Sequence, residues 1–361
     1  MARRVSIKDV AQRAGVSWKT VSNVVNERPV VRADTREKVL AAIDELGYVP
    51  NHIGRDLRGG PTRSIALVVP ELQNPYFARL AERMQAAARE RGYTVSVEVS
   101  LHSAEVERAH VRGRTARPVD AVVISPSALE PSDLLDRRSG PPVVLLGESL
   151  TAAPNVVHVA IDNVSSAADV VRHLVGTGHR RLLFLGAEGA VRSTGTDRLA
   201  GFTAASRFAE LPLEDALIRA TGAWDRESGR EEVLRALEEG IAFDAVVAGN
   251  DLLAIGALAA LRERGLRVPD DVAVVGWDDM VEAAWTVPTL TSVAPDLDAL
   301  VAAALAAAIS GAERGTEQDA ERDAGQAAAG ADDSGKRGAS RTGGAETVIA
   351  HRLIVRESTR A

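Results

Sequence analysis

The sequence predicts an all-α helix-turn-helix headpiece followed by an α/β domain with two lobes, each built on a doubly wound parallel sheet. Residues 5–58 contain helical patterns, with a glycine between the first two of them. From Ser64 onwards, short β-branched runs alternate with helical segments, as buried parallel strands and their crossover helices do. The alternation occurs in two successive sets, which predicts two lobes.

The first two helices carry the helix-turn-helix. Ser6 can cap the first helix, with Asp9 three residues on as its acidic partner. Gly15 breaks this helix and allows a tight turn, and Ser17 can cap the second helix, residues 18–25. Helices joined in this way form a DNA-binding motif whose second helix reads the major groove.

The second helix has an apolar and a polar side. Val21, Val24 and Val25 can hold it against the first helix, whereas its polar side chains can donate to phosphates or read base edges. In and around this motif, we expect DNA contacts from Ser6, Ser17, Trp18, Lys19, Thr20, Ser22, Asn23 and Asn26. A third helix over residues 34–46, ended by Gly47, would complete a small core.

Two runs in this region are specific. The run IKDVAQRAGVSWKTVSNVVN, followed by TREKVLAAIDELGYVPN, resembles the headpiece of the LacI/GalR family of bacterial transcription repressors. NPYF (74–77), DRLAGF (197–202) and the long run at 249–279 fit the same family further along the chain. The resemblance implies a repressor whose second domain has a periplasmic-binding-protein-like fold. The competing interpretation is a helical bundle without a DNA role.

Residues 51–62 link the headpiece to the rest of the chain. The resemblance implies a hinge helix that forms on operator DNA and wedges a leucine, here Leu57, into the minor groove. We also expect Tyr48 and Asn51 to contact DNA. Gly54 departs from the family and disfavours a helix by about 1 kcal/mol relative to Ala, so we expect the hinge to be disordered off DNA. The alternative is a plain flexible linker.

Charge and composition narrow the function classes. The net charge is −7, but residues 1–60 hold 11 basic and 7 acidic residues, so a +4 headpiece precedes a −11 remainder. This asymmetry is expected when the headpiece alone meets phosphate. With no Cys, no long apolar run and no apolar secretory segment near Met1, we expect a cytoplasmic protein without membrane, metal or cofactor.

The predicted strands and helices define the domain boundaries. The first set has strands at 65–69, 93–99, 121–124 and 143–146 and helices at 75–91 and 104–115. The second has strands at 181–185, 245–248 and 272–275 and helices at 163–177, 196–209, 226–239 and 250–264. We therefore predict a headpiece (1–50), a hinge (51–62) and an effector-binding and dimerisation domain (63–361). Its lobe 1 would comprise 63–161 and 293–312, and its lobe 2 would comprise 162–290 and 346–361.

Residues 311–345 are poor in large apolar side chains and rich in Gly, Ala, Asp, Glu and Ser. Such a segment cannot bury enough surface to hold a fold, which predicts a disordered insertion between a helix at 296–310 and a last strand near 347–355. A regulatory segment and a neutral surface insertion are both consistent with this composition.

Ligands of two-lobed α/β folds bind between the lobes, at the carboxyl ends of strands. Asn, Asp and Arg can pair with adjacent hydroxyls, and an aromatic face can cover a sugar ring or stack on a base. The residues expected to bind an effector are Asn74, Tyr76, Phe77, Ser125, Glu148, Arg198, Trp224, Asn250 and Asp278. The resemblance implies this role for Arg198, Asn250 and Asp278 most directly. For Asn250 and Asp278 the alternative is helix capping.

The chain contains no GxSxG, HExxH or Walker sequence, so we expect no catalysis. The expected function is a homodimeric repressor that binds palindromic double-stranded operator DNA under the control of a small molecule, a sugar. The alternatives are a cytoplasmic sugar-binding protein and a regulator that responds to a nucleoside or purine.

Overall fold

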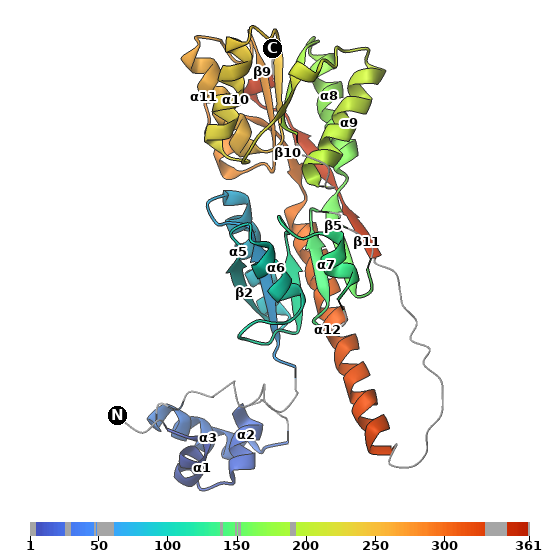
Figure 1. Cartoon of the computed structure of the whole chain (residues 1–361). Coiled ribbons are helices and arrows are strands. Elements are labelled where there is room, and N and C mark those ends of the chain that lie inside the picture. The colour runs from blue at the N-terminus through green and yellow to red at the C-terminus, as the bar shows by residue number, and fades with distance from the viewer. Residues whose placement is uncertain are drawn as a thin grey trace. The chain divides into compact units, whose positions relative to one another are not determined.

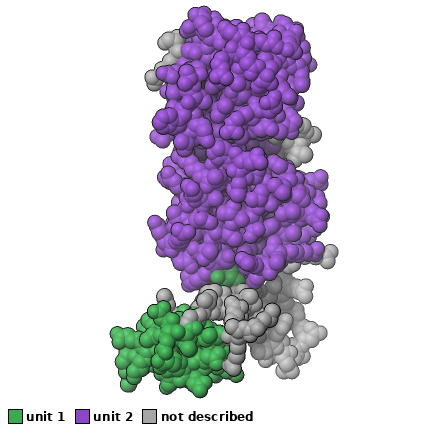
Figure 2. Space-filling view, turned by 90° about the vertical axis from the view of Figure 1, so that its left-hand side faces the viewer, with its two compact units in different colours: residues 1–62 green, residues 63–361 purple. Residues whose placement is uncertain are grey.

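The computed structural model describes residues 5–25, 30–46, 48, 61–137, 140–148, 150, 153–187, 193–328 and 345–359. The chain divides into two compact units, residues 1–62 and 63–361 (Figures 1 and 2).

The first unit contains helices α1 (Ile7–Ala14), α2 (Trp18–Val25) and α3 (Ala33–Leu46) around one small apolar core. The predicted caps are confirmed. Ser6 Oγ accepts the Asp9 amide at 3.4 Å while Asp9 Oδ2 accepts the Ser6 amide at 2.8 Å, and Ser17 Oγ accepts the Thr20 amide at 3.1 Å. Gly15 has φ +65°, as its tight turn requires. Gly47 and residues 51–60 of the predicted hinge lie outside the described residues.

Lobe 1 of the second unit is built on a parallel sheet of order β11-β5-β4-β3-β1-β2. Its strands are β1 (Ser64–Val69), β2 (Thr94–Val99), β3 (Ala121–Ile124), β4 (Val143–Leu146), β5 (Val156–Ile161) and β11 (Ala345–Ile349). Helices α5 (Pro75–Glu90) and α12 (Leu297–Ala328) pack on one face, and α6 (Ala104–Val111) and α7 (Pro131–Leu135) on the other.

Lobe 2 has a sheet of order β12-β10-β9-β8-β6-β7, in which only the β10–β12 pair is antiparallel. Its strands are β6 (Leu182–Ala187), β7 (Ile218–Ala220), β8 (Ala245–Ala248), β9 (Ala273–Trp277), β10 (Thr291–Pro295) and β12 (His351–Ile354). Helices α8 (Asn163–Gly176) and α9 (Thr194–Phe208) cover one face, and α10 (Arg226–Glu238) and α11 (Asp251–Glu263) the other (Figure 1). Three short 3-10 helices, η1 (Asp215–Leu217), η2 (Val281–Ala284) and η3 (Glu357–Thr359), complete the described part of this lobe.

The boundaries predicted for the two lobes are wrong at the crossings between them. β10 lies in the lobe 2 sheet, although residues from 293 were assigned to lobe 1. The single strand predicted near 347–355 is two strands that break at Ala350, and β11 pairs with β5 in lobe 1. The Asp296 amide donates to the Ala350 carbonyl at 3.0 Å, so two crossings run side by side. Because the chain crosses between the lobes in so few residues, the pattern of apolar residues in the sequence continues without a break. This explains why the sequence misplaces the lobe boundaries.

The prediction of disorder over 311–345 is wrong for residues 311–328, because α12 continues to Ala328. This stretch is rich in Ala, Glu, Gln and Arg, which are strong helix formers that require no buried face. Gly311 and Ala312 are themselves buried, and a Cβ on Gly311 would come within 2.6 Å of Pro142. Residues 329–344 lie outside the described residues.

Candidate functional site

Helix α2 has the two sides that the sequence predicts. Val21 and Val24 are buried in the core of the first unit, whereas Ser17, Trp18 and Lys19 are exposed at the start of the helix. The remaining predicted reading residues of α2, which are half-buried, are Thr20, Ser22 and Asn23.

The other residues expected to contact DNA divide into two groups. The Ser6 hydroxyl donates to Asp9 Oδ2 at 2.7 Å, and Tyr48 packs against the core of the first unit. Asn26, Asn51 and Leu57 lie outside the described residues.

In the second unit, Arg198 lies in contact with Trp224, another predicted effector residue. It is 6% exposed, its Nε donates to Asn163 Oδ1 at 2.9 Å, and one terminal nitrogen donates to the Gly249 carbonyl. Its guanidinium carbon lies 5.9 Å from the ring centroid of Trp224 and 5.2 Å from that of Trp277. Two indole rings and two hydrogen bonds thus hold a buried cation in one orientation.

Trp224 follows β7 and lies against glycine backbone. A Cβ on Gly249 would come within 2.9 Å of the indole, and one on Gly186 within 3.3 Å, so the glycines at the ends of β8 and β6 make room for the ring. The Trp224 Nε1 atom is buried and has no hydrogen-bond partner within the described ranges. An indole N–H is a donor only, so a partner for this group would have to be an acceptor.

Asn250 and Asn74, both expected to bind effector, cap helices. Asn250 Oδ1 accepts the Leu253 amide at 2.8 Å, and its Nδ2 donates to the Trp224 carbonyl at 3.0 Å. Asn74 Oδ1 accepts the Tyr76 amide at 3.0 Å. The capping interpretation therefore holds for Asn250, although its amide retains a second hydrogen and lone pair for a ligand.

Asp278 follows β9 and does not cap η2, whose preceding residue is Met280. Its backbone has φ +96°, which is uncommon for a residue with a side chain. Burial raises the pKa of the Asp278 carboxyl, and the positive charge of Arg198 opposes this shift. Burial, and then the charge of Asp278, raise the pKa of the Tyr76 hydroxyl. Tyr76, Arg198 and Asp278 therefore form one electrostatically coupled group.

The remaining predicted effector residues lie at the rim of lobe 1. The Phe77 ring meets Tyr76 edge to face with centroids 5.3 Å apart. Ser125 follows β3, and its amide donates to the Val68 carbonyl. The Glu148 carboxylate is bonded to Thr194 of lobe 2.

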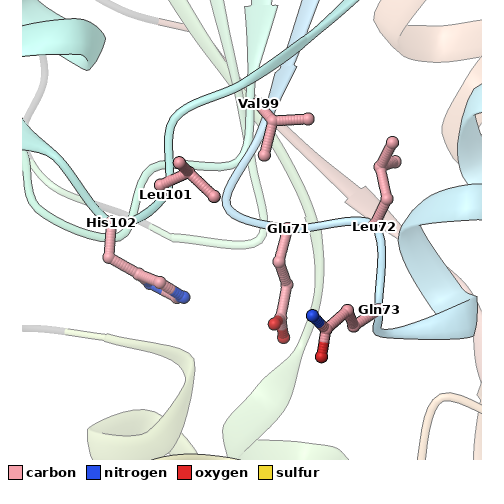
Figure 3. Close-up of a pocket in the computed structure, with 6 residues that line it drawn as sticks. All are labelled: Glu71, Leu72, Gln73, Val99, Leu101 and His102. Carbon is pink, nitrogen blue, oxygen red and sulfur yellow. The ribbon is translucent and has the colours of Figure 1, made fainter.

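Two cavities flank this region. One of about 250 Å³ includes Tyr76 and Asp278 in its wall, together with Arg79, Asp296 and His351. The other, of about 590 Å³, lies at the ends of β1 and β2 in lobe 1, and none of the predicted effector residues lines it. Figure 3 shows its Glu71 and Gln73 side chains on the loop after β1 and its His102 on the loop after β2.

Sequence reasoning missed several residues that shape this region. Trp277 supplies the second indole ring beside the Arg198 guanidinium. Asp251 accepts a hydrogen bond from the Met280 amide, in the turn that carries Asp278. The motif GWDD at 276–279 could have indicated Trp277. Over the described ranges there is no cluster of His, Asp or Glu side chains suited to a metal ion. In the same part of the chain no helix is both long and apolar enough to cross a membrane.

Known proteins share both units. Residues 6–51 match bacterial regulatory proteins of the lacI family, and residues 171–324 match the periplasmic binding protein-like domain. The HTH-type transcriptional regulator AscG of Escherichia coli K12 is 38% identical over 292 residues, which cover 79% of this chain and 85% of AscG. Catabolite control protein A of Priestia megaterium is 30% identical over 301 residues, or 83% of this chain and 90% of that protein.

Solved structures agree with this assignment. The Lac repressor dimer bound to operator and the anti-inducer ONPF is 27% identical, with a TM-score of 0.77 over 99% of this chain and 100% of that one. The complex of the transcriptional regulator CelR with cellobiose is 30% identical, with a TM-score of 0.64 over 98% and 100%. The chain therefore belongs to the LacI family, with a helix-turn-helix headpiece and a two-lobed periplasmic-binding-protein-like domain, and it is a DNA-binding transcription regulator rather than an enzyme.

Proposed function

We propose that this regulator is a cytoplasmic repressor that binds a palindromic operator as a homodimer, and that a small uncharged carbohydrate between its lobes sets its affinity for the operator. The observation that carries the proposal is the group formed by Arg198, Trp224 and Asp278 at the carboxyl ends of the lobe 2 strands. Effector binding shifts the equilibrium between lobe arrangements by its differential affinity for them.

The chemistry of this group suits a sugar. Arg198 offers donors and Asp278 offers acceptors, and together they can pair with adjacent hydroxyls. The Trp224 ring can cover the apolar face of a sugar, and its buried N–H supplies a further donor. A relative of this chain, CelR, has been solved in complex with cellobiose. The Trp224 ring could also stack on a purine, which is the alternative class of effector.

The surface of lobe 2 supports self-association. Val281, Trp285 and Val287 lie within seven residues of one another and are 62%, 81% and 92% exposed. Clustered exposed apolar side chains mark interaction surfaces. A two-fold symmetric dimer places two headpieces on two half-sites, as a palindromic operator requires. A solved relative, the Lac repressor, is described as a dimer on its operator.

The test measures binding of the full chain to DNA from upstream of its own coding region, by fluorescence anisotropy. Cellobiose represents the sugars and hypoxanthine the purines, and scrambled DNA is the control. The proposal predicts that the chain binds the upstream DNA tightly and the scrambled DNA weakly. It also predicts that adding the sugar changes the affinity for the upstream DNA. A response to hypoxanthine but not to sugars would contradict the carbohydrate class, and equal binding to scrambled DNA would contradict operator recognition.

Asp278→Asn provides the matched variant, because it keeps the shape of the side chain but removes its charge. It should bind the upstream DNA as the wild type does, since the headpiece is unchanged. Its sugar affinity should fall by about tenfold or more, because a charged hydrogen bond contributes roughly 1.5–3 kcal/mol. An unchanged sugar affinity would remove Asp278 from the site.

A further inference from the structure

A buried carboxylate lies directly behind the proposed effector site. Asp251, the first residue of α11, is 0% exposed. Its Oδ2 accepts the Met280 amide at 2.8 Å, and its Oδ1 accepts the Ser292 hydroxyl at 2.7 Å. Acidic side chains are almost never fully buried unless they are paired, yet no Lys, Arg or His bonds this one in the described part of the chain.

The two hydrogen bonds of Asp251 converge on the turn that follows β9. Ser292 Oγ, which donates to Asp251, also accepts the Asp279 amide at 3.0 Å. Asp251 thus restrains two successive amides of the turn, that of Met280 directly and that of Asp279 through Ser292. Asp278, which presents its carboxylate to the effector site, is the residue before them.

This turn needs restraint because of its backbone conformation. Asp278 has φ +96° and Asp279 has φ +46°, a left-handed region that side-chain-bearing residues seldom adopt. Such backbone conformations are unfavourable and persist only where the surrounding structure holds them in place. The hydrogen bonds that the Met280 amide donates to Asp251 and the Asp279 amide donates to Ser292 hold the turn in this conformation.

The chain leaves room for this carboxylate. A Cβ on Gly276, in β9, would lie 2.2 Å from Asp251 Oδ1 and 3.2 Å from the Ala254 Cβ. Glycine at this position is therefore what allows the first turn of α11 to lie against β9. The glycine of the motif GWDD thus leaves space for the aspartate of the motif GND, which lies more than twenty residues earlier in the sequence.

The same end of α11 also holds the opposite wall of the site. Asn250, the residue before Asp251, donates to the carbonyl of Trp224 at 3.0 Å. Two neighbouring side chains thus fix the loop that carries Trp224 and the turn that carries Asp278. The distance between the Trp224 ring and the Asp278 carboxylate therefore depends on the amino-terminal end of α11.

Burial disfavours the charged form of Asp251. It raises the pKa of the Asp251 carboxyl well above its usual range, and the nearby charge of Asp278 acts in the same direction. The hydrogen bonds from Ser292 and Met280 oppose the shift. Because an unpaired buried acid costs stability, the turn that it positions explains its presence better than stability does.

We propose that Asp251 is a positioning residue, which holds the turn of residues 278–280 in the left-handed conformation that presents the Asp278 carboxylate to the effector. The proposal deepens the function proposed above and rests on it for the effector. The restraint of the turn does not depend on any ligand, so it can be tested in the ligand-free chain.

The test is amide hydrogen exchange in the full chain, resolved to single residues, for Asp251→Ala, Asp251→Asn and Ser292→Ala. Asp251→Ala should speed exchange at both Asp279 and Met280 by about fivefold, since one lost hydrogen bond contributes roughly 1 kcal/mol. Ser292→Ala should speed exchange at Asp279 far more than at Met280, because Asp251 still accepts the Met280 amide. Asp251→Asn should give a smaller effect of the same pattern.

Asp244→Ala is the matched control. The Asp244 carboxylate also accepts two successive backbone amides, those of Arg180 at 2.7 Å and Arg181 at 2.9 Å, just before strands β8 and β6 of the same sheet. This variant should leave exchange at Asp279 and Met280 unchanged. The proposal is overturned if the Asp251 variants leave exchange at these two amides unchanged, or if they speed exchange equally throughout lobe 2. If Asp251→Ala does not fold, Ser292→Ala and Asp251→Asn decide.

Titration with cellobiose separates this proposal from the one on which it rests. Where the wild type binds cellobiose, Asp251→Asn should raise the dissociation constant by about two- to fivefold while Asp244→Ala leaves it unchanged. A wild type that ignores cellobiose argues against that sugar as effector. Unaltered exchange at residues 279 and 280 argues against the positioning role, whatever the effector.

Discussion

The Glu148 carboxylate accepts two hydrogen bonds from Thr194, one from the backbone nitrogen at 2.6 Å and one from the hydroxyl at 2.8 Å, and the two residues belong to different lobes. Glu148 follows β4 of lobe 1, and Thr194 is the first residue of α9 in lobe 2. A carboxylate at this end of a helix is stabilised by the free amides and the helix dipole. One turn further along α9 lies Arg198, so the contact joins lobe 1 to the helix that carries a proposed effector residue.

Removing this contact should loosen the lobes. We expect Glu148→Ala to favour a more open arrangement, seen as a larger radius of gyration by small-angle X-ray scattering of the ligand-free chain. The two lost hydrogen bonds together contribute roughly 1–3 kcal/mol. The control is Thr194→Ser, which keeps the hydroxyl and the amide and should scatter as the wild type does. Identical scattering by Glu148→Ala and the wild type would show that other contacts, such as that from Arg79 to the Asp279 carbonyl, hold the lobes.

The exposed cluster of lobe 2 predicts where self-association occurs. Trp285→Ser should raise the dissociation constant of the dimer by more than about tenfold, because large aromatic anchors contribute 2 kcal/mol or more to an interface. Sedimentation of the full chain over a concentration series measures this. Phe208→Ser is the control, since Phe208 is 93% exposed at the end of α9 but lies outside the cluster. Equal weakening by both substitutions would mean that the cluster is not the interface.

Two carboxylates of lobe 2 should give stability a pH dependence of opposite sign. Because burial raises the pKa of Asp251, the folded chain keeps its proton at pH values where the unfolded chain has lost it. The wild type should therefore lose stability relative to Asp251→Asn as pH rises above the ordinary carboxyl range. Asp278, whose pKa is also raised, titrates in both proteins.

Asp271 is the counterpart. Hydrogen bonds from the Arg267 side chain and amide lower its pKa to about 2. The unfolded chain then binds the proton first, so the wild type should gain stability relative to Asp271→Asn as pH rises through the ordinary carboxyl range. Thermal unfolding of the three proteins between about pH 2 and 7 checks both signs. Parallel curves for the wild type and Asp251→Asn would mean that Asp251 does not titrate in this range.

The sequence predicts correctly those strands that are buried along their whole length. The strands at 121–124, 143–146 and 245–248 have the predicted bounds, because each is a continuous β-branched or apolar run buried on both sides. It missed β5, in which half-buried and buried residues mix, and β7, which has three residues. The periodicity of apolar residues in the sequence does not identify these two strands.

The residue types of the candidate site could be predicted from the sequence, but the residues that contact them in the fold could not. Asn250 and Asp251 are adjacent polar residues at the start of a helix, and sequence reasoning selected only the first of them. The burial of Asp251 is set by Gly276 and Ser292, which are distant in the sequence and meet it only in the folded sheet. Likewise, Glu148 has the type of a ligand residue, but the neighbouring lobe supplies its partner.

Asn23, half-buried on α2, predicts an operator preference that one substitution should change. Arg at this position would pair bidentately with guanine O6 and N7, whereas Asn suits adenine N6 and N7. Asn23→Arg should therefore shift the preferred base at one symmetric pair of operator positions toward guanine, by about 1–3 kcal/mol.

Selection from random DNA with both proteins measures the shift, and Gln12→Arg separates base reading from charge. Gln12 is exposed on α1, so this control adds the same positive charge outside the reading helix. Both variants should steepen the salt dependence of binding, because each adds a group that can displace counterions from phosphate. Only Asn23→Arg should alter the recovered motif. If its motif matches that of the wild type at every position while the salt dependence steepens, Asn23 faces phosphate or solvent, and base reading belongs to the exposed residues at the start of the helix, Trp18 and Lys19.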